Sequence, residues 1–316
     1  MKRIIILLLF CFSLSCAFGF QFKNPFKKKP PEEKPKMVET VQEWEEQSAN
    51  IPLEERKIEN TYKPPESTKE YIYPNPRYYF EKYNYPQGYR EVNIEDIRKN
   101  TYSYPYLVSD VNFNYVAYAR YYYAPDIDQI SSEFYVEKLD TTISRVDRIL
   151  NYTHNAKERR PVVQSGMKKG YPKLFGGLSL VDWSMDSRKV LIKEKVGSTI
   201  KGIYKTYLYV YILPDEVNSG YTLKLSGFDS AIRQYFREYQ NKLIIKYRYD
   251  IVPLGFSAED DDVIVAHCFV LDKEGKKLFM GTWGYNIRTN ETMLYSTVDP
   301  VFPLSTNGML LRESYN

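Results

Sequence analysis

Hydrophobic and polar residues alternate along most of the chain after about residue 106, and this period of two is typical of strands with one buried face. The pattern predicts strands at 115–123, 133–139, 174–181, 189–195, 207–213, 221–225, 242–250, 262–270, 278–287 and 292–296. A weaker strand is predicted at 145–152. The chain also contains 31 tyrosines, a residue that favours half-buried strand faces, so we expect an all-β body.

One segment of this body has the period of a helix instead. In 229–240 the apolar residues form a single stripe, made by Ala231, Ile232, Tyr235, Phe236 and Tyr239. Asp229 or Ser226 can cap the start of this helix, and Asn241 can end it. A second, short helix is expected within 91–99.

Three of the predicted strand pairs follow an aromatic residue and a short polar turn. The aromatic residues are Phe113, Trp183 and Phe256, which lie about 70 residues apart. In each copy a second strand follows the first at hairpin distance, which indicates an internal repeat. The clearest copy is 182–213, where we expect Trp183 to be a packing residue and Asp186 a turn residue.

The middle copy reads Trp-Ser-Met-Asp-Ser-Arg-Lys-Val-Leu from Trp183 onward. It resembles the W-S-P-D-G-K module of TolB-like, WD40-like β-propeller repeats, in which this turn joins the first two strands of a blade. Met185 and Ser187 stand where that family has proline and glycine. The resemblance implies an irregular or incomplete propeller-like array of about three to four blades over 106–316, with one inserted helix. A β-sandwich is the alternative.

The first 19 residues have the pattern of a signal peptide. A basic start (2–3) precedes an apolar run (4–12) that is too short for a permanent membrane span, and small residues fit cleavage after Gly19. Lipidation at Cys16 is the alternative reading, with Leu14 one place later than a lipobox would have it. Both readings place the protein in the periplasm or cell envelope.

Export changes what the rest of the composition implies. Cleavage after Gly19 leaves Cys268 as the one cysteine, so we expect no intramolecular disulfide and no cysteine-based zinc site. Basic and acidic residues are then nearly balanced, so nothing points to nucleic acid as a partner. No later stretch is apolar and long enough for a membrane span.

Two further segments precede the body. Residues 20–60 are expected to form a flexible, charged, proline-containing arm, whose lysine run (27–29) could alternatively rest on anionic lipid headgroups. A short amphipathic helix could form around Trp44. Residues 61–105 are rich in tyrosine and proline, and we expect an irregular segment that packs on the body.

A search for chemistry finds little. His267 lies among apolar residues of a predicted strand, and adjacent Cys268 points to the opposite face, so the two cannot form a catalytic dyad. His154 has no partner at ligand spacing. The acidic run 259–262 could bind calcium, but we favour a solvated hairpin tip, because the run lacks the spacing of a calcium loop. Trp283 is expected to pack over neighbouring glycines.

These observations predict an exported, envelope-associated protein that acts as a non-catalytic protein-binding or structural module. The expected partner is an envelope protein, and no cofactor, metal or catalytic residue is assigned. Membrane association would be peripheral or through a lipid anchor. The alternative is an extracytoplasmic hydrolase or lyase that acts on glycan or peptide from a propeller surface.

Overall fold

Strands make up most of the described chain, which confirms the all-β class. The computed structural model describes residues 70–71, 77–83, 94–99, 106–153, 159–166, 172–200, 204–217, 219–239, 248–271, 277–298 and 302–313. All of them lie in one unit, 47–316. The predicted signal peptide, the charged arm, His154 and most of the strand predicted at 242–250 fall outside the described residues.

Twelve of the described strands form three antiparallel groups of four. The first group is β3 (Val108–Ser109), β4 (Tyr115–Ala124), β5 (Gln129–Lys138) and β6 (Val163–Ser165). The second is β7 (Leu174–Trp183), β8 (Lys189–Ser198), β9 (Tyr204–Ile212) and β10 (Tyr221–Lys224). The third is β11 (Arg248–Ser257), β12 (Val263–Leu271), β13 (Lys277–Asn286) and β14 (Glu291–Ser296). Most of the strands predicted from alternation in 106–296 thus exist close to their expected bounds. The exceptions are 145–152 and 242–250, since β11 overlaps the latter only at 248–250 and continues to Ser257.

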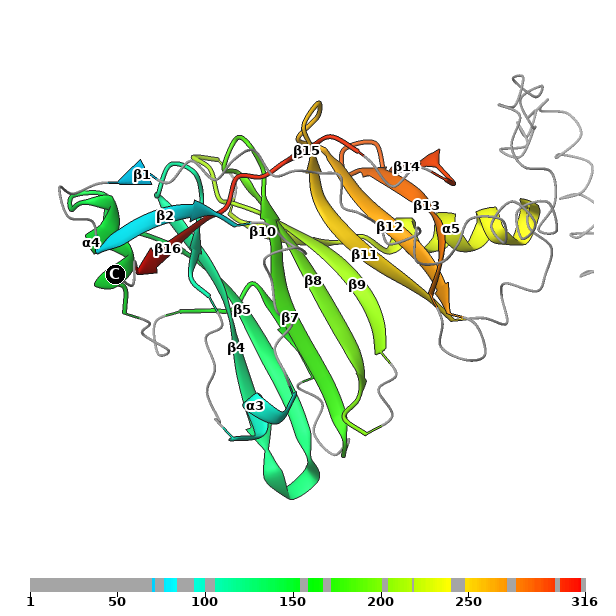
Figure 1. Cartoon of the computed structure of the whole chain (residues 1–316), viewed down its shortest axis with the longest axis horizontal. Coiled ribbons are helices and arrows are strands. Elements are labelled where there is room, and N and C mark those ends of the chain that lie inside the picture. The colour runs from blue at the N-terminus through cyan, green and yellow to red at the C-terminus, as the bar shows by residue number, and fades with distance from the viewer. Residues whose placement is uncertain are drawn as a thin grey trace, which may run out of the picture. The chain divides into compact units, whose positions relative to one another are not determined.

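The groups belong to two sheets (Figure 1). A parallel pairing of Ile130 with Phe175 joins the first two groups, and β16 (Met309–Glu313), β2 (Tyr78–Lys82) and β1 (Glu70–Tyr71) extend the same sheet beyond β3. The third group and β15 (Leu304–Ser305) make the second sheet. Within the described residues, neither sheet closes on itself.

The second group lies between the other two. Val190, Leu191 and Ile192 are consecutive residues of β8 and are all fully buried, which requires cover on both faces of the strand. On the side of the first group, the Tyr121 hydroxyl donates to the carbonyl oxygen of Leu178. On the side of the third group, β11 contacts β7, β8 and β9. The second group is therefore covered on one side by the first group and on the other by β11 of the third.

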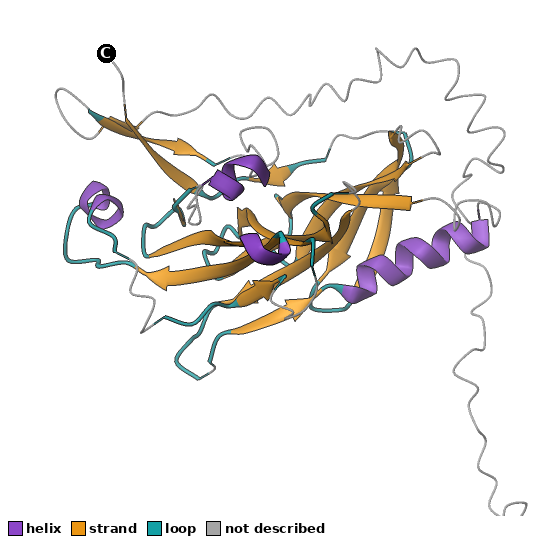
Figure 2. Ribbon diagram, turned by 90° about the horizontal axis from the view of Figure 1, so that it is seen from below, coloured by secondary structure: helices purple, strands orange, loops and turns teal. Residues whose placement is uncertain are grey.

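Helix α5 (Ser226–Tyr239) covers the face of the third group that carries Trp283 and Tyr285 (Figure 2). The rings of Tyr235 and Phe236 pack edge-on against Trp283, and Phe228 packs against Tyr285. This confirms the predicted helix, which begins three residues earlier than expected, and the expected packing role of Trp283.

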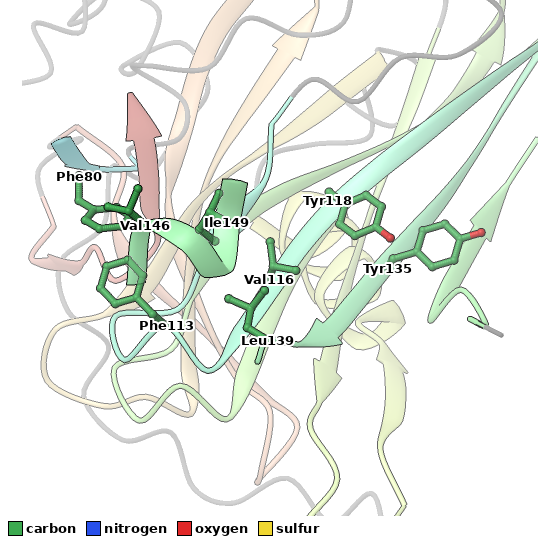
Figure 3. Packing of buried hydrophobic residues seen from close by; sticks show 8 residues of the cluster. All are labelled: Phe80, Phe113, Val116, Tyr118, Tyr135, Leu139, Val146 and Ile149. Carbon is green, nitrogen blue, oxygen red and sulfur yellow. The ribbon is translucent and has the colours of Figure 1, made fainter. Parts of the chain in front are cut away.

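The other end of the stack is covered by helix α4 (Arg145–Leu150), where the prediction of a strand was wrong. The Ser144 hydroxyl caps the helix by accepting from the Asp147 amide at 3.2 Å. Val146 and Ile149, three residues apart, then point into one cluster, as only a helix allows. Figure 3 shows this cluster, whose members are Phe80, Phe113, Val116, Tyr118, Tyr135, Leu139, Val146 and Ile149.

Two short helices lie near the β4–β5 hairpin. Helix α3 (Ile94–Lys99) falls within the segment predicted to be helical, and η1 (Pro125–Ile127) forms the hairpin tip. Arg98 of α3 donates hydrogen bonds from Nη2 to both carboxylate oxygens of Asp128, each at 2.9 Å. This pair ties α3 to the hairpin.

The packing of α5 gives the first testable prediction. Replacing Phe236 with alanine should lower the free energy of unfolding by about 3–5 kcal/mol, because a fully buried ring is lost from the contact with Trp283. Arg237→Ala, at the next and exposed position, should change it by less than about 0.5 kcal/mol. Urea unfolding of both variants measures this, and equal losses would contradict the assignment of the buried helix face.

Candidate functional site: the turn face

Each group carries a short turn after its first strand, and the three turns meet. The turns are 110–114 in the first group, 184–188 in the second and 258–262 in the third, and together we call them the turn face. They follow β3, β7 and β11, so the repeated topology brings them to the same place in the stack.

The structure places the predicted repeat residues in and beside these turns. Trp183 ends β7 and pairs with Val190. Phe256 lies near the end of β11 and pairs with Ile264. The side chains of Trp183 and Phe256 are fully buried. In the first group the residue in this position is Ser109, which pairs with Val116. Phe113 instead lies inside the first turn. Its backbone has the left-handed conformation that Ser187 has in the second turn.

Hydrogen bonds connect the turns to one another. The side-chain amide of Asn112 donates to Ser187 Oγ at 3.2 Å, which joins the first turn to the second. The carboxylate of Asp261 accepts from the amides of Met185 and Asp186, both at 3.0 Å, which joins the third turn to the second. The turn face is therefore one connected surface.

Asp186 organises the middle turn from inside. Its carboxylate accepts from Ser184 Oγ at 2.5 Å and from the Arg188 amide at 2.8 Å, as a turn aspartate does. Burial disfavours the charged form, but these bonds and the Lys189 ammonium hold the pKa of Asp186 below its ordinary value. The predicted role of Asp186 as a turn residue agrees with these contacts.

The acidic run at 259–262 is not simply a solvated tip. Besides the two amides bound by Asp261, Asp262 lies 3.2 Å from Lys189 Nζ and 3.3 Å from Arg288 Nε. Only Glu259 of the run belongs to the exposed class. Among the described residues, no three His, Cys, Asp or Glu side chains are placed to hold a metal ion.

Behind the turns lies a buried carboxylate, Asp182, which sequence reasoning had not selected. Its Oδ1 accepts from the Trp183 amide at 2.8 Å and from the Asn307 amide at 3.3 Å. The Phe256 amide also donates to this carboxylate. A Cβ atom at Gly255 would lie only 2.9 Å from Asp182 Oδ2, so the close approach of β11 requires glycine there.

Burial dominates the electrostatics of Asp182. Its side chain is withdrawn from water, and the nearby carboxylate of Asp261 adds repulsion, so the pKa of Asp182 is raised well above its ordinary value of 3.8 despite three backbone donors. The carboxyl joins the second group, the third group and the C-terminal segment at one point.

Two apolar side chains project from the turn face into solvent. Met185, at the tip of the second turn, is 57% exposed, and Val111, in the first turn, is 41% exposed. Their backbones are held by the bonds within and between turns, so the side chains are displayed on a rigid base. A pair of fixed apolar residues with a polar rim is a common feature of protein-binding surfaces.

The remaining candidates lie away from the turn face and inside the fold. His267 is buried on β12. Its ring lies edge-on to those of Phe269 and Phe279, with ring centroids 6.0 and 5.3 Å apart. Cys268 is also buried, which raises the pKa of its thiol far above the usual range and keeps it protonated. His267 is thus a core residue, as expected, and Cys268 is buried beside it.

Sequence reasoning also missed a tyrosine–carboxylate network on β4 and β5. The carboxylate of Glu133 accepts from the hydroxyls of Tyr122 and Tyr135, both at 2.6 Å, and from Gln164 at 2.8 Å. Burial works against its charge, yet these donors hold the pKa of Glu133 below its ordinary value. The sequence does show tyrosines and a glutamate at alternating positions of adjacent predicted strands. Only the pairing register of the strands decides which of these side chains meet.

The fold and this surface define an all-β protein built from stacked four-stranded antiparallel groups. No protein-family model matches the chain, and no curated protein matches its sequence. Among the described residues, none of the helices has both the length and the apolar character needed to cross a membrane.

The contact between turns gives the second prediction. Asp261→Ala should lower the free energy of unfolding by about 1 kcal/mol and speed amide exchange at Met185 and Asp186, because both amides lose their acceptor. Glu259→Ala is the matched control in the same run and should do neither. Faster exchange in the control as well would mean that the charge of the run, rather than the Asp261 bonds, holds the turn.

The buried carboxyl gives the third prediction. Because the folded-state pKa of Asp182 lies above its ordinary value of 3.8, its contribution to stability is present below about pH 4 and is lost as pH rises through the folded pKa. Asp182→Asn cannot titrate. The wild type should therefore lose stability relative to this variant as pH rises from about 4 to 8.

Urea unfolding of both proteins across that pH range measures the difference in their free energies of unfolding. The other titrating groups are common to both proteins, so their contributions cancel in this difference. Parallel profiles would show that Asp182 has the same pKa in the folded and unfolded states.

Proposed function

We propose that this protein is an exported, envelope-associated binding module that holds a partner protein at its turn face and carries out no catalysis. The observation that carries the proposal is the exposure of Met185 and Val111 on turns that hydrogen bonds connect, the first and the third each to the second. Binding at a preorganised surface avoids much of the entropy cost of ordering loops.

The three groups are, in this proposal, the blades of an incomplete propeller-like array. Three features support it: each group is a four-stranded antiparallel unit, the second group is covered on one side by the first and on the other by β11 of the third, and each has a turn after its first strand. Helices α4 and α5 cover the two outer faces, where further blades would otherwise pack. An open array capped in this way needs no ring closure.

Export rests on the amino-terminal pattern. A basic start, an apolar run at 4–12 and small residues before Phe20 are typical of a cleaved signal peptide. An envelope protein is therefore the class of partner that the turn face would meet. The polar rim supplied by Asp186, Arg188 and Glu259 fits a protein surface.

The test uses the full precursor, expressed in a bacterial host and recovered from the envelope fraction. Its mass should correspond to a chain that begins at Phe20, and the immobilised protein should retain a defined partner from envelope extracts. Met185→Asp should reduce retention at least about tenfold, because a charge replaces the central apolar contact.

Val217→Asp is the matched control, since Val217 is 89% exposed on the β9–β10 connection, outside the turn face. It should retain the partner as the wild type does. Equal retention by Met185→Asp and the wild type would overturn the turn face as the binding surface, and an uncleaved chain in the cytoplasm would overturn export.

A further inference from the structure

The last described segment of the chain crosses all three groups. Residues 302–313, which include β15 and β16, are named here the strap. The strap meets the third group first, then the second and then the first, so it runs against the order of the groups in the sequence (Figure 1).

Its first contacts are with the third group. In β15, Ser305 pairs with Phe256 and Leu304 with Ser257, at the end of β11. The amide of Ala258, the first residue of the third turn, donates to the carbonyl oxygen of Pro303 at 3.1 Å. The strap therefore holds the point at which β11 enters its turn.

The strap then passes the second group at Asn307. The Asn307 amide donates to the Asp182 carboxylate at 3.3 Å, and the Asn307 side chain donates to the carbonyl oxygen of Trp183 at 3.1 Å. The next residue, Gly308, is buried, and a Cβ atom there would lie 2.9 Å from Val108 Cγ1 and 3.4 Å from Trp183 Cδ1. These contacts lie immediately before the second turn.

In the first group, β16 pairs with β3 through Leu310 and Met309, which lie opposite Val108 and Ser109. Its other edge pairs along its full length with β2. The first turn begins directly after Ser109, at Asp110. The strap is thus bonded to the residues that precede, or begin, each of the three turns.

The strap is less deeply buried than a core strand. Leu310 is its one buried apolar side chain, and Phe302, Leu304, Met309 and Leu311 are half-buried against two core clusters, whereas β8 buries three successive apolar residues completely. Its ion pairs, Arg312 with Glu81 and Arg77 with Glu313, are at least one-third exposed at every partner, and such pairs contribute little. A segment whose apolar side chains are mostly half-buried opens more readily than a core strand.

We propose that the strap is a conformational latch: when it is docked, the turns hold their binding arrangement, and when it opens locally, all three loosen together. The inference rests on the proposed function, because the turn face matters as a binding surface only if that proposal is right. Partner binding at the turn face would in return favour the docked strap, since coupling between two sites is reciprocal.

Amide exchange of the full chain, followed by mass spectrometry, tests the coupling. Gly308→Val should speed exchange by about tenfold or more both in 309–313 and at the turn amides of Asp186 and Ser187, while β8 and β12 keep wild-type rates. Val298→Ala is the control, because Val298 is exposed and lies just ahead of the strap. It should leave both regions unchanged.

Faster exchange in the strap without any change at the turns would overturn the latch. If Gly308→Val does not fold, the wild type in low urea decides: strap and turn amides should share one opening free energy below that of β8, and separate values would overturn the proposal.

Partner retention separates the two proposals. Asn307→Ala is a milder strap variant, which removes only the side-chain bond to the carbonyl oxygen of Trp183. Coupled exchange together with weaker partner retention by this variant supports the latch as a regulator of binding. Coupled exchange with unchanged retention overturns that regulation. Absence of retention by the wild type overturns the proposed function, while the exchange result still decides whether the strap and the turns open together.

Discussion

The buried carboxyl group of Asp182 is the contact on which the placement of the second group, the third group and the C-terminal segment depends. It lies in β7 of the second group, accepts from Phe256 of the third, and accepts from Asn307 of the C-terminal segment. Burying this carboxyl group is costly, and its three backbone donors offset only part of the cost, because its pKa stays well above the ordinary value. One misplaced strand would leave the buried group without a partner, so this junction favours a single relative placement of the second and third groups.

Stacking explains the pattern of burial as well as the positions of the helices. A four-stranded group has two faces, and the second group is covered on both because it lies between its neighbours. The first and third groups each have one outer face, which α4 and α5 cover respectively. The helices therefore complete the fold where no further group packs, and the repeated turns are left as the surface that all three groups share.

The turn face combines a rigid base with exposed apolar tips. Asp261 holds the backbone of the second turn by accepting from two successive amides, and the Met185 side chain at this turn is 57% exposed. The C-terminal segment is hydrogen-bonded to the residues before or at the start of each turn. In the two proposals above, partner binding and local opening would therefore be linked through a few backbone hydrogen bonds.

The sequence by itself predicted most of the strands, a helix at 229–240 that the structure has at 226–239, and a turn at Asp186, because period and turn chemistry are local properties. Only the tertiary structure decided that 145–152 begins as a helix, since the cluster it packs against comes from distant strands. It also decided that Asp182 and Asn307 meet across 125 positions of the sequence. A buried polar junction of this kind depends on register and stacking, which a local pattern does not encode.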